Sequence, residues 1–336
     1  MSGYNLSRRR AITVIGVGAG ISLLPLDRPS RGAAPLYQWN GTSLGSPSHV
    51  LLSHPSREAA ARAMARCAEE IERLERIFGL YRGDSEITRL NRDGRIASPS
   101  SDLICVLSEC SRLSALSGGA FDVTVQPLWD AYAAHFFASR SRPAGGPDPR
   151  AIAAAVRLVD WQQVNFGPGE VVLGRPGMGL TLNGIAQGYV ADRIIGILRD
   201  CGFGSAFADL GHSELFALGL HPTERPWRVG LADPRQPANV AITADLLDCS
   251  LCTSGGYGTR FEPSGKYHHL FVPGTGQSAS HYIAVSVFSQ RAMVADALST
   301  ALYVAPPDRS RELLAGYPGA SALVTRPDGT MERLPG

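Results

Sequence analysis

Residues 252 to 302 decide the fold of this chain, and they read CTSGGYGTRFEPSGKYHHLFVPGTGQSASHYIAVSVFSQRAMVADALSTAL. In order, the stretch contains a small-residue turn (TSGG, 253–256), the pair His268-His269, a second turn (PGTG, 273–276) and a predicted helix carrying Asp296 and Thr300. Residues four apart share a helix face, so this carboxylate and hydroxyl project together. Two such oxygens suit Mg²⁺, which completes its shell with water and substrate phosphates. Because the turns can offer backbone N–H groups to phosphate oxygens, the stretch predicts a metal-assisted phosphate-ester site.

The segment LNGIAQGYV at residues 182–190 predicts an anion site of a second kind. An apolar strand end passes through Gly184 into a helix, and a helix start presents unpaired N–H groups that suit a pyrophosphate. A tight strand-to-helix connection without a ligand explains this segment equally simply, and taken alone it is the favoured interpretation.

Three other features have a bland and a functional interpretation. Asp122, in the turn GAFD, can cap that turn or bind a ribose or base edge. A histidine pair before an apolar strand is more often a packing feature, but beside a phosphate site it becomes a candidate general base. Asp296 could simply be a polar position on an apolar helix, yet burying an ionised carboxylate without a partner is expensive, and a cation explains it.

The hydrophobic pattern favours an α+β fold over a doubly wound sheet, because helices and strands do not alternate regularly. Helices are predicted at 57–80, with apolar positions Ala61, Met64, Ala68, Ile71, Leu74 and Phe78, and at 101–117 and 149–159. Strands are predicted near 163–166, 170–173, 206–210, 227–231 and 283–288, and an exposed connection at 139–149. Glycines 118 and 119 are expected to end the second helix in a left-handed conformation.

The N-terminus predicts an export signal followed by one large domain. Arg8-Arg9 precede a weakly apolar run, 11–26, that is too short and too rich in glycine for a confident membrane span. A twin-arginine signal at 1–34, a domain at 35–336 and a periplasmic location follow, with contact to the membrane only transient or through an uncleaved signal. A basic tail before a buried helix is the alternative.

The formal net charge of +2, without a basic block, argues against nucleic-acid binding. Cys249 and Cys252 form a lone CxxC, for which buried or locally bridged thiols are favoured over a redox or zinc site.

Collinear motifs over residues 36–305 resemble the FAD:protein FMN transferase (ApbE) family. They are LGS (44–46), YRGDSEITRLN (81–91), GGAFDVTVQPLW (118–129), LNGIAQGYVADRI (182–194), DLGHSELFALG (209–219), TSGGY (253–257), YHHLFVPGTG (267–276) and VADALSTAL (294–302). The resemblance implies a single T-fold-related flavin transferase domain that uses FAD as substrate and Mg²⁺ as cofactor. It also implies an acceptor domain belonging to an exported part of a membrane redox complex.

By this resemblance, each site residue receives an expected role. The catalytic residues are His269 and Asp296; the metal ligands are Asp296, Thr300 and the carbonyl of Gly184; and the flavin nucleotide contacts Leu44, Tyr81, Ala120, Phe121, Asp122, Thr181, Gln187, Ser254 and His269. The sequence departs from the family pattern at Thr181, Gln187, Val272 and Gly274, where charged residues are common. Two alternatives therefore stay open: an FAD pyrophosphatase that releases FMN and AMP, and a noncatalytic flavin-binding or maturation protein.

Overall fold

The computed structural model describes residues 22–23, 34–137, 145–211 and 213–336. The predicted export segment, apart from Ser22, Leu23 and Ala34, lies outside the described residues, as does 139–144 of the predicted exposed connection. The signal and the boundary at residue 34 therefore stay predictions. No helix in the described ranges has the length and apolar character needed to cross a membrane.

The centre of the fold is an eight-stranded sheet in which every neighbouring pair is antiparallel. Its strands, in spatial order, are β14 (Met331–Leu334), β13 (Ser321–Thr325), β12 (Ala284–Ser289), β11 (Cys249–Ser254), β8 (Glu214–Leu218), β7 (Ala206–Leu210), β3 (Ser46–Ser53) and β2 (Leu36–Ser43). An antiparallel sheet with separate helices confirms the predicted α+β class.

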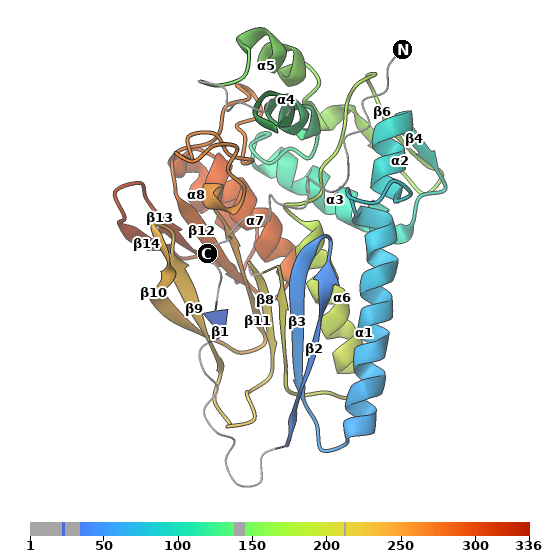
Figure 1. Cartoon of the computed structure of the whole chain (residues 1–336), viewed down its shortest axis with the longest axis vertical. Coiled ribbons are helices and arrows are strands. Elements are labelled where there is room, and N and C mark those ends of the chain that lie inside the picture. The colour runs from blue at the N-terminus through green and yellow to red at the C-terminus, as the bar shows by residue number, and fades with distance from the viewer. Residues whose placement is uncertain (1–21, 24–33, 138–144, 212) are drawn as a thin grey trace.

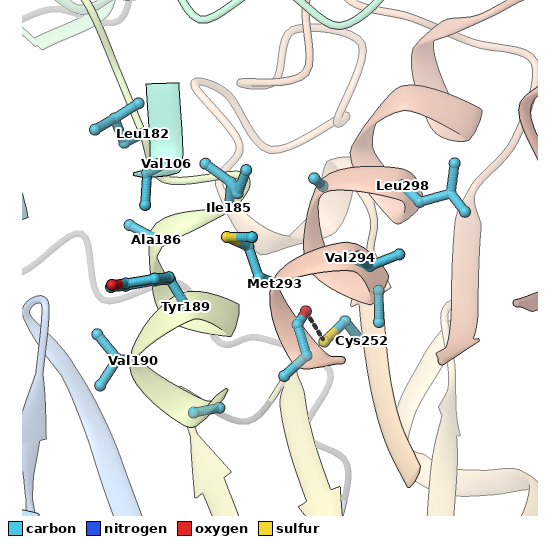
Figure 2. Close-up of a cluster of buried hydrophobic side chains, with 14 of the residues drawn as sticks. Val106, Leu182, Ile185, Ala186, Tyr189, Val190, Cys252, Met293, Val294 and Leu298 are labelled. Atoms are coloured by element: carbon cyan, nitrogen blue, oxygen red, sulfur yellow. Dashed lines mark hydrogen bonds between the residues drawn. The ribbon is translucent and has the colours of Figure 1, made fainter. Parts of the chain in front are cut away.

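Three helices, α1 (Arg57–Phe78), α6 (Ala186–Asp200) and α7 (Ala292–Val304), cover one face of this sheet (Figure 1). Their apolar sides and the inner side of the sheet form the main core. Between α6 and α7 this core includes Ile185, Ala186 and Met293 (Figure 2). The opposite face is covered by the ribbon of β9 (Trp227–Asp233) and β10 (Gln236–Leu246), beside which β1 (Ser22–Leu23) pairs with β9. The main sheet is thus a middle layer.

The remaining elements are mostly helices that add to the side of the sheet covered by α1, α6 and α7. They are α2 (Glu86–Asp93), β4 (Arg95–Ala97), α3 (Ser101–Leu116), α4 (Gln126–Phe137), α5 (Pro149–Val156), β5 (Val164–Phe166), β6 (Glu170–Leu173) and α8 (Ser310–Ala315), with short 3-10 turns at Trp161–Gln163, Gly256–Gly258 and Pro307–Arg309. An aromatic cluster attaches α4 to the loop after β11 through Tyr132, Phe136, Phe261 and Phe271. Tyr132 Oη also donates a hydrogen bond to the carbonyl oxygen of Gly276 at 3.0 Å. This loop, which carries the histidine pair, is therefore packed in place.

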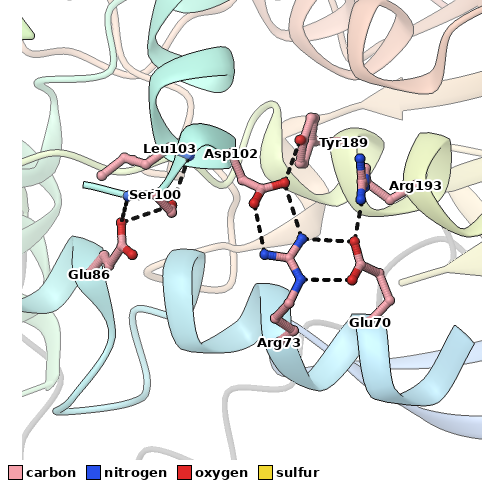
Figure 3. A network of polar contacts seen from close by, with 8 residues as sticks. All are labelled: Glu70, Arg73, Glu86, Ser100, Asp102, Leu103, Tyr189 and Arg193. Carbon is pink, nitrogen blue, oxygen red and sulfur yellow. Dashed lines mark hydrogen bonds and ion pairs between the residues drawn. The ribbon is translucent and has the colours of Figure 1, made fainter. Parts of the chain in front are cut away.

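A polar network joins α1, α3 and α6 at their contact (Figure 3). Arg73 donates to Asp102 Oδ2 at 2.8 Å and to Glu70 at 2.8 Å, while Tyr189 Oη donates to Asp102 Oδ1 at 2.7 Å. Arg193 donates to Glu70 Oε1 at 2.9 Å. Because α6 begins at the predicted anion site, this network fixes the helix that positions it.

Most predicted elements are confirmed within a few residues, and two details are wrong. On α1 the buried face includes Ala60 and Ala63, whereas Ala61 is exposed, so the predicted face is rotated at its start. The residues before Gly184 are not a strand end. Leu180 exchanges both backbone hydrogen bonds with the Asn91 side chain (2.7 and 2.8 Å), which satisfies the backbone without a neighbouring strand.

Candidate active site

Two aspartates fix the crossing of α6 and α7 by capping each other's helix. Asp296 on α7 accepts a hydrogen bond at Oδ2 from the backbone N of Gly188 on α6, at 2.9 Å. In return, Asp192 on α6 accepts from Ala292 N at 2.7 Å and from Met293 N at 3.1 Å. Gly188 permits this approach, since a Cβ there would lie 2.3 Å from the carbonyl oxygen of Ala292. The first turn of α6 therefore holds Asp296 through the Gly188 N–H, while the N–H groups of Ile185 and Ala186 are bonded to the Leu182 carbonyl oxygen.

Asp296 is a buried carboxylate in an acidic surrounding. It is 3% exposed, and no basic side chain in the described part of the chain pairs with it. Burial raises its pKa to about 7, and the charge of Asp192 adds to this effect. Burial and the charge of Asp296 also raise the pKa of Glu214, at the start of β8, well above its usual range. A cation or a proton is needed here to offset the negative charge.

A cluster of hydroxyl groups joins the same helix to β11. Ser254 Oγ, at the end of β11, is 2.7 Å from Ser299 Oγ and 3.0 Å from Thr300 Oγ1. Ser299 Oγ also donates to the carbonyl oxygen of Asp296 at 2.8 Å. Gly184 lies next to Thr300, because a Cβ at Gly184 would sit 2.9 Å from Thr300 Oγ1. The structure thus brings Gly184 and Ser254 against Thr300, which lies on the helix that carries Asp296.

This donor set fits Mg²⁺ in kind. Within the described residues, no group of three or more His, Cys, Asp or Glu side chains is placed to hold a metal ion. Asp296, however, uses only one carboxylate oxygen for Gly188, and the Ser254 hydroxyl and Gly184 lie beside Thr300. Mg²⁺ is commonly held by one or two carboxylates together with substrate phosphates, so Asp296, Thr300 and Gly184 suffice as protein ligands.

The two histidines have different hydrogen-bonding roles. His268 is buried and uses both ring nitrogens: Nε2 lies 2.9 Å from the Ala279 carbonyl oxygen, and Nδ1 accepts from Leu270 N at 3.3 Å. His269 Nδ1 lies 3.3 Å from the Thr259 carbonyl oxygen, and no described residue bonds to its Nε2. Since a carbonyl oxygen only accepts, Nδ1 carries the hydrogen and Nε2 keeps a lone pair. Desolvation and then the neighbouring His268 lower the pKa of His269 to about 4, so its imidazole is neutral at pH 7.

The segment 253–256 is partly strand, and two of its N–H groups are bonded within the protein. Thr253 and Ser254 belong to β11, and Thr253 N donates to the Ser213 carbonyl oxygen at 2.9 Å. Gly256 N donates to Tyr303 Oη at 3.1 Å. Because these two N–H groups are already satisfied, they are not available to a phosphate, and the segment contributes the Ser254 hydroxyl to the site.

The residues expected around the flavin nucleotide form two further groups. Near the turn between β2 and β3, Leu44 N donates to Glu75 Oε1 at 3.0 Å, and Gln187 Nε2 donates to the Ser43 carbonyl oxygen at 3.2 Å. Tyr81 is 78% exposed, and its ring lies against Gly45. This exposed ring, next to the turn that Gln187 contacts, is available for stacking on a planar ligand.

The second group lies before and beside the start of α6. Thr181 N donates to the Val123 carbonyl oxygen at 2.8 Å, which places Ala120, Phe121 and Asp122 in the neighbouring segment. The Phe121 side chain is buried in the core. Asp122 accepts from Thr124 N and Oγ1 (2.8 and 2.6 Å) and from Trp161 N (3.1 Å), so its carboxylate caps the turn. Contacts from Phe121 to a ligand would have to use its backbone.

At the four positions where the sequence departs from the family pattern, the side chains are uncharged. Gln187 is buried and bonded to the β2–β3 turn, while Thr181 Oγ1 accepts from Asn183 N at 3.4 Å. Val272 packs on the core, and Gly274 has open space where a side chain would be. Cys249 and Cys252 are free thiols on β11, and Cys252 is buried.

Sequence reasoning missed several residues of this site. They are Ser299, Glu214, Gly188, Asp192 and Tyr303. Only Gly188 gave a signal, because a glycine inside a predicted helix often marks close packing. The others act through partners far away in the sequence.

Comparison with known proteins agrees with this architecture. The model of the ApbE family matches residues 44–324. The FAD:protein FMN transferase of Treponema pallidum is 33% identical over 83% of this chain and 81% of its own length, and that of Haemophilus influenzae is 27% identical over 94% and 92%. Among solved structures, the ApbE protein of Thermotoga maritima superposes with a TM-score of 0.78 at 25% identity, covering 89% of this chain and 97% of its own. The chain belongs to the ApbE family.

Proposed function

We propose that this protein is a Mg²⁺-dependent FAD:protein FMN transferase. It takes FAD as substrate, attaches the FMN moiety to a Ser or Thr hydroxyl of an acceptor protein through a phosphoester, and releases AMP. Membership of the ApbE family and the names of its relatives, FAD:protein FMN transferases, support flavin transfer to a protein.

One observation carries the proposal. Asp296 is buried without a basic partner among the described residues, and it retains a carboxylate oxygen beyond the one bonded to Gly188. It also lies on the same helix as Thr300, whose hydroxyl pairs with that of Ser254 on β11. A buried ionised group of this kind needs a cation. The first turn of α6 begins beside it, and a helix N-terminus favours phosphate oxygens.

The protein residues then have distinct tasks. Asp296, Thr300 and the Gly184 carbonyl would hold Mg²⁺, which when bound neutralises charge on the phosphate oxygens. The start of α6 positions the pyrophosphate, and Tyr81 with the β2–β3 turn orients the flavin end. The acceptor hydroxyl oxygen attacks the phosphorus on the FMN side, and the bond from that phosphorus to the oxygen of AMP breaks. His269 Nε2, or alternatively Asp296, takes the hydroxyl proton.

Intact mass spectrometry of an acceptor tests this function. Purified protein, FAD, Mg²⁺ and a candidate acceptor domain should give acceptor that has gained one FMN per released AMP. Replacing the acceptor hydroxyl residue with Ala should abolish the gain, because the nucleophile is gone. Release of FMN and AMP without labelled acceptor would instead identify an FAD pyrophosphatase, and FAD binding without either product would identify a flavin-binding protein.

We further propose a periplasmic location reached by the twin-arginine route, with the exported domain of a membrane redox complex as acceptor. The support is the Arg8-Arg9 pair before a weakly apolar segment. Replacing both arginines with lysine keeps the charge but removes the recognised pair, so the protein should stay in the cytoplasm. Fractionation showing unchanged delivery to the periplasm would contradict this route.

A further inference from the structure

Gly256 is clamped between two aromatic side chains. Its N–H donates to Tyr303 Oη at 3.1 Å, and both residues are buried. On its other side lies the His268 ring, which a Cβ on Gly256 would meet at 2.7 Å. The rings of His268 and Tyr303 meet edge to face, with centroids 5.9 Å apart. A residue larger than glycine has no room at this position.

Both rings are themselves fixed. Tyr303 lies on α7, one turn beyond Ser299 and Thr300, among buried core residues. His268 has each ring nitrogen in a hydrogen bond to the backbone, at Ala279 and Leu270. The clamp therefore ties the chain directly after β11 to α7 and to the histidine loop.

The clamp acts on the hydroxyl cluster because Gly256 lies two residues beyond Ser254. Ser254 Oγ reaches both Ser299 and Thr300, at 2.7 and 3.0 Å. Ser254 is the last residue of β11, where the strand ladder ends. Without the Gly256–Tyr303 bond, the chain beyond Ser254 would lose its hydrogen bond to α7.

We infer that Tyr303 is a positioning residue for the transfer reaction: through Gly256 it holds Ser254 in register with Thr300, and it does not itself touch the substrate. The inference rests on the proposed function. Small displacements of reacting groups are costly in enzymes, since a shift of about 1 Å can lower the rate about 100-fold.

The experiment compares Tyr303→Phe with Tyr317→Phe. Tyr317 is a matched control because it is also buried, and its hydroxyl donates to Glu109 Oε1 at 2.6 Å, away from the site. In the protein without ligands, hydrogen exchange of a peptide covering 253–258 should become at least about tenfold faster in Tyr303→Phe. Tyr317→Phe should leave that peptide unchanged. Unaltered exchange in Tyr303→Phe would overturn the clamp, whatever reaction the protein catalyses.

The transfer assay then tests the link to Ser254. Tyr303→Phe should lower kcat about tenfold, with KM for FAD changed less than about twofold. In a Ser254→Ala background the same substitution should cost less than about twofold, because the group that Tyr303 positions is already absent. Independent, multiplying losses in the double variant, or a normal kcat in Tyr303→Phe, would overturn the inference. Absence of transfer by the unaltered protein would count against the proposed function, while the exchange result would still decide the clamp.

Discussion

Replacing Gly188 with alanine should destabilise the protein, although alanine is the better helix former. The new Cβ would lie 2.3 Å from the Ala292 carbonyl oxygen and 2.7 Å from Asp296 Cβ. The first is a backbone atom, so α6 and α7 must move apart. Overpacking of this kind costs about 2 kcal/mol. The bond from Gly188 N to the Asp296 carboxylate would weaken as well, at a cost of about 2 kcal/mol.

The gain in helix propensity offsets about 1 kcal/mol, which leaves a net loss of about 3 kcal/mol. For a domain of about 300 residues the unfolding entropy is about 0.6 kcal/mol/K, so Tm should fall by about 5 °C. Gly196→Ala is the matched control: it lies on the same helix with no atom within 4 Å of the new Cβ. There propensity acts alone and should raise Tm by about 1–2 °C. Thermal denaturation of both variants decides the matter, and a Tm for Gly188→Ala at or above the unaltered protein would refute the packing argument.

Three further predictions follow from the site and its supports. Asp296→Asn keeps an oxygen for Gly188 N but loses the charge, so the protein should stay folded. Its Tm should no longer rise with Mg²⁺ and FAD, and transfer should fall at least about tenfold. Normal metal-dependent transfer would mean that Asp296 is not a ligand. Burial lowers the pKa of His268 to about 4, below its unfolded value, so its contribution to stability is present above about pH 6.5 and is lost toward pH 4, by up to about 3 kcal/mol. Denaturant unfolding across this range should show that the free energy of unfolding depends less on pH in His268→Gln. An equal pH dependence would contradict the lowered pKa of His268. Arg73→Met leaves the carboxylates of Asp102 and Glu70 without their shared guanidinium and should cost about 1–2 kcal/mol, less than a fully buried pair because the Arg73 side chain is 38% exposed, while transfer per folded molecule should be unchanged.

The sequence predicts well those elements whose own pattern determines them. Strands β6 and β7 begin and end at the predicted residues, Glu170–Leu173 and Ala206–Leu210, and Gly118 and Gly119 have the expected positive φ values of 62° and 84°. Helix α4 was not predicted, because its sequence is apolar on several sides and gives no amphipathic stripe. Its environment explains this: both α5 and the loop containing Phe261 and Phe271 pack against it.

In the candidate site, too, local spacing predicts some residues, whereas contacts between distant residues are not predicted. Spacing along one helix suffices to place Asp296 and Thr300 on α7, and the structure adds Ser254 and Gly184 around Thr300. The hydrogen-bond partner of Gly256 is Tyr303, 47 residues later, and no local pattern could indicate that this N–H is occupied. The sequence therefore could not show that part of the predicted phosphate-binding turn is already bonded within the protein.

The number of hydrogen bonds that each carboxylate accepts also distinguishes two aspartates that cannot be told apart from the sequence. Asp192 and Asp296 both cap a helix at the crossing of α6 and α7, and burial raises the pKa of both. Asp192 uses both oxygens for backbone N–H groups, and the charges of Arg291 and Arg199 favour its ionised form. Asp296 has one such bond and no basic neighbour among the described residues, so its ionised form lacks compensation. Asp192 is therefore complete as a structural cap, whereas the ionised form of Asp296 is compensated only when a cation joins it.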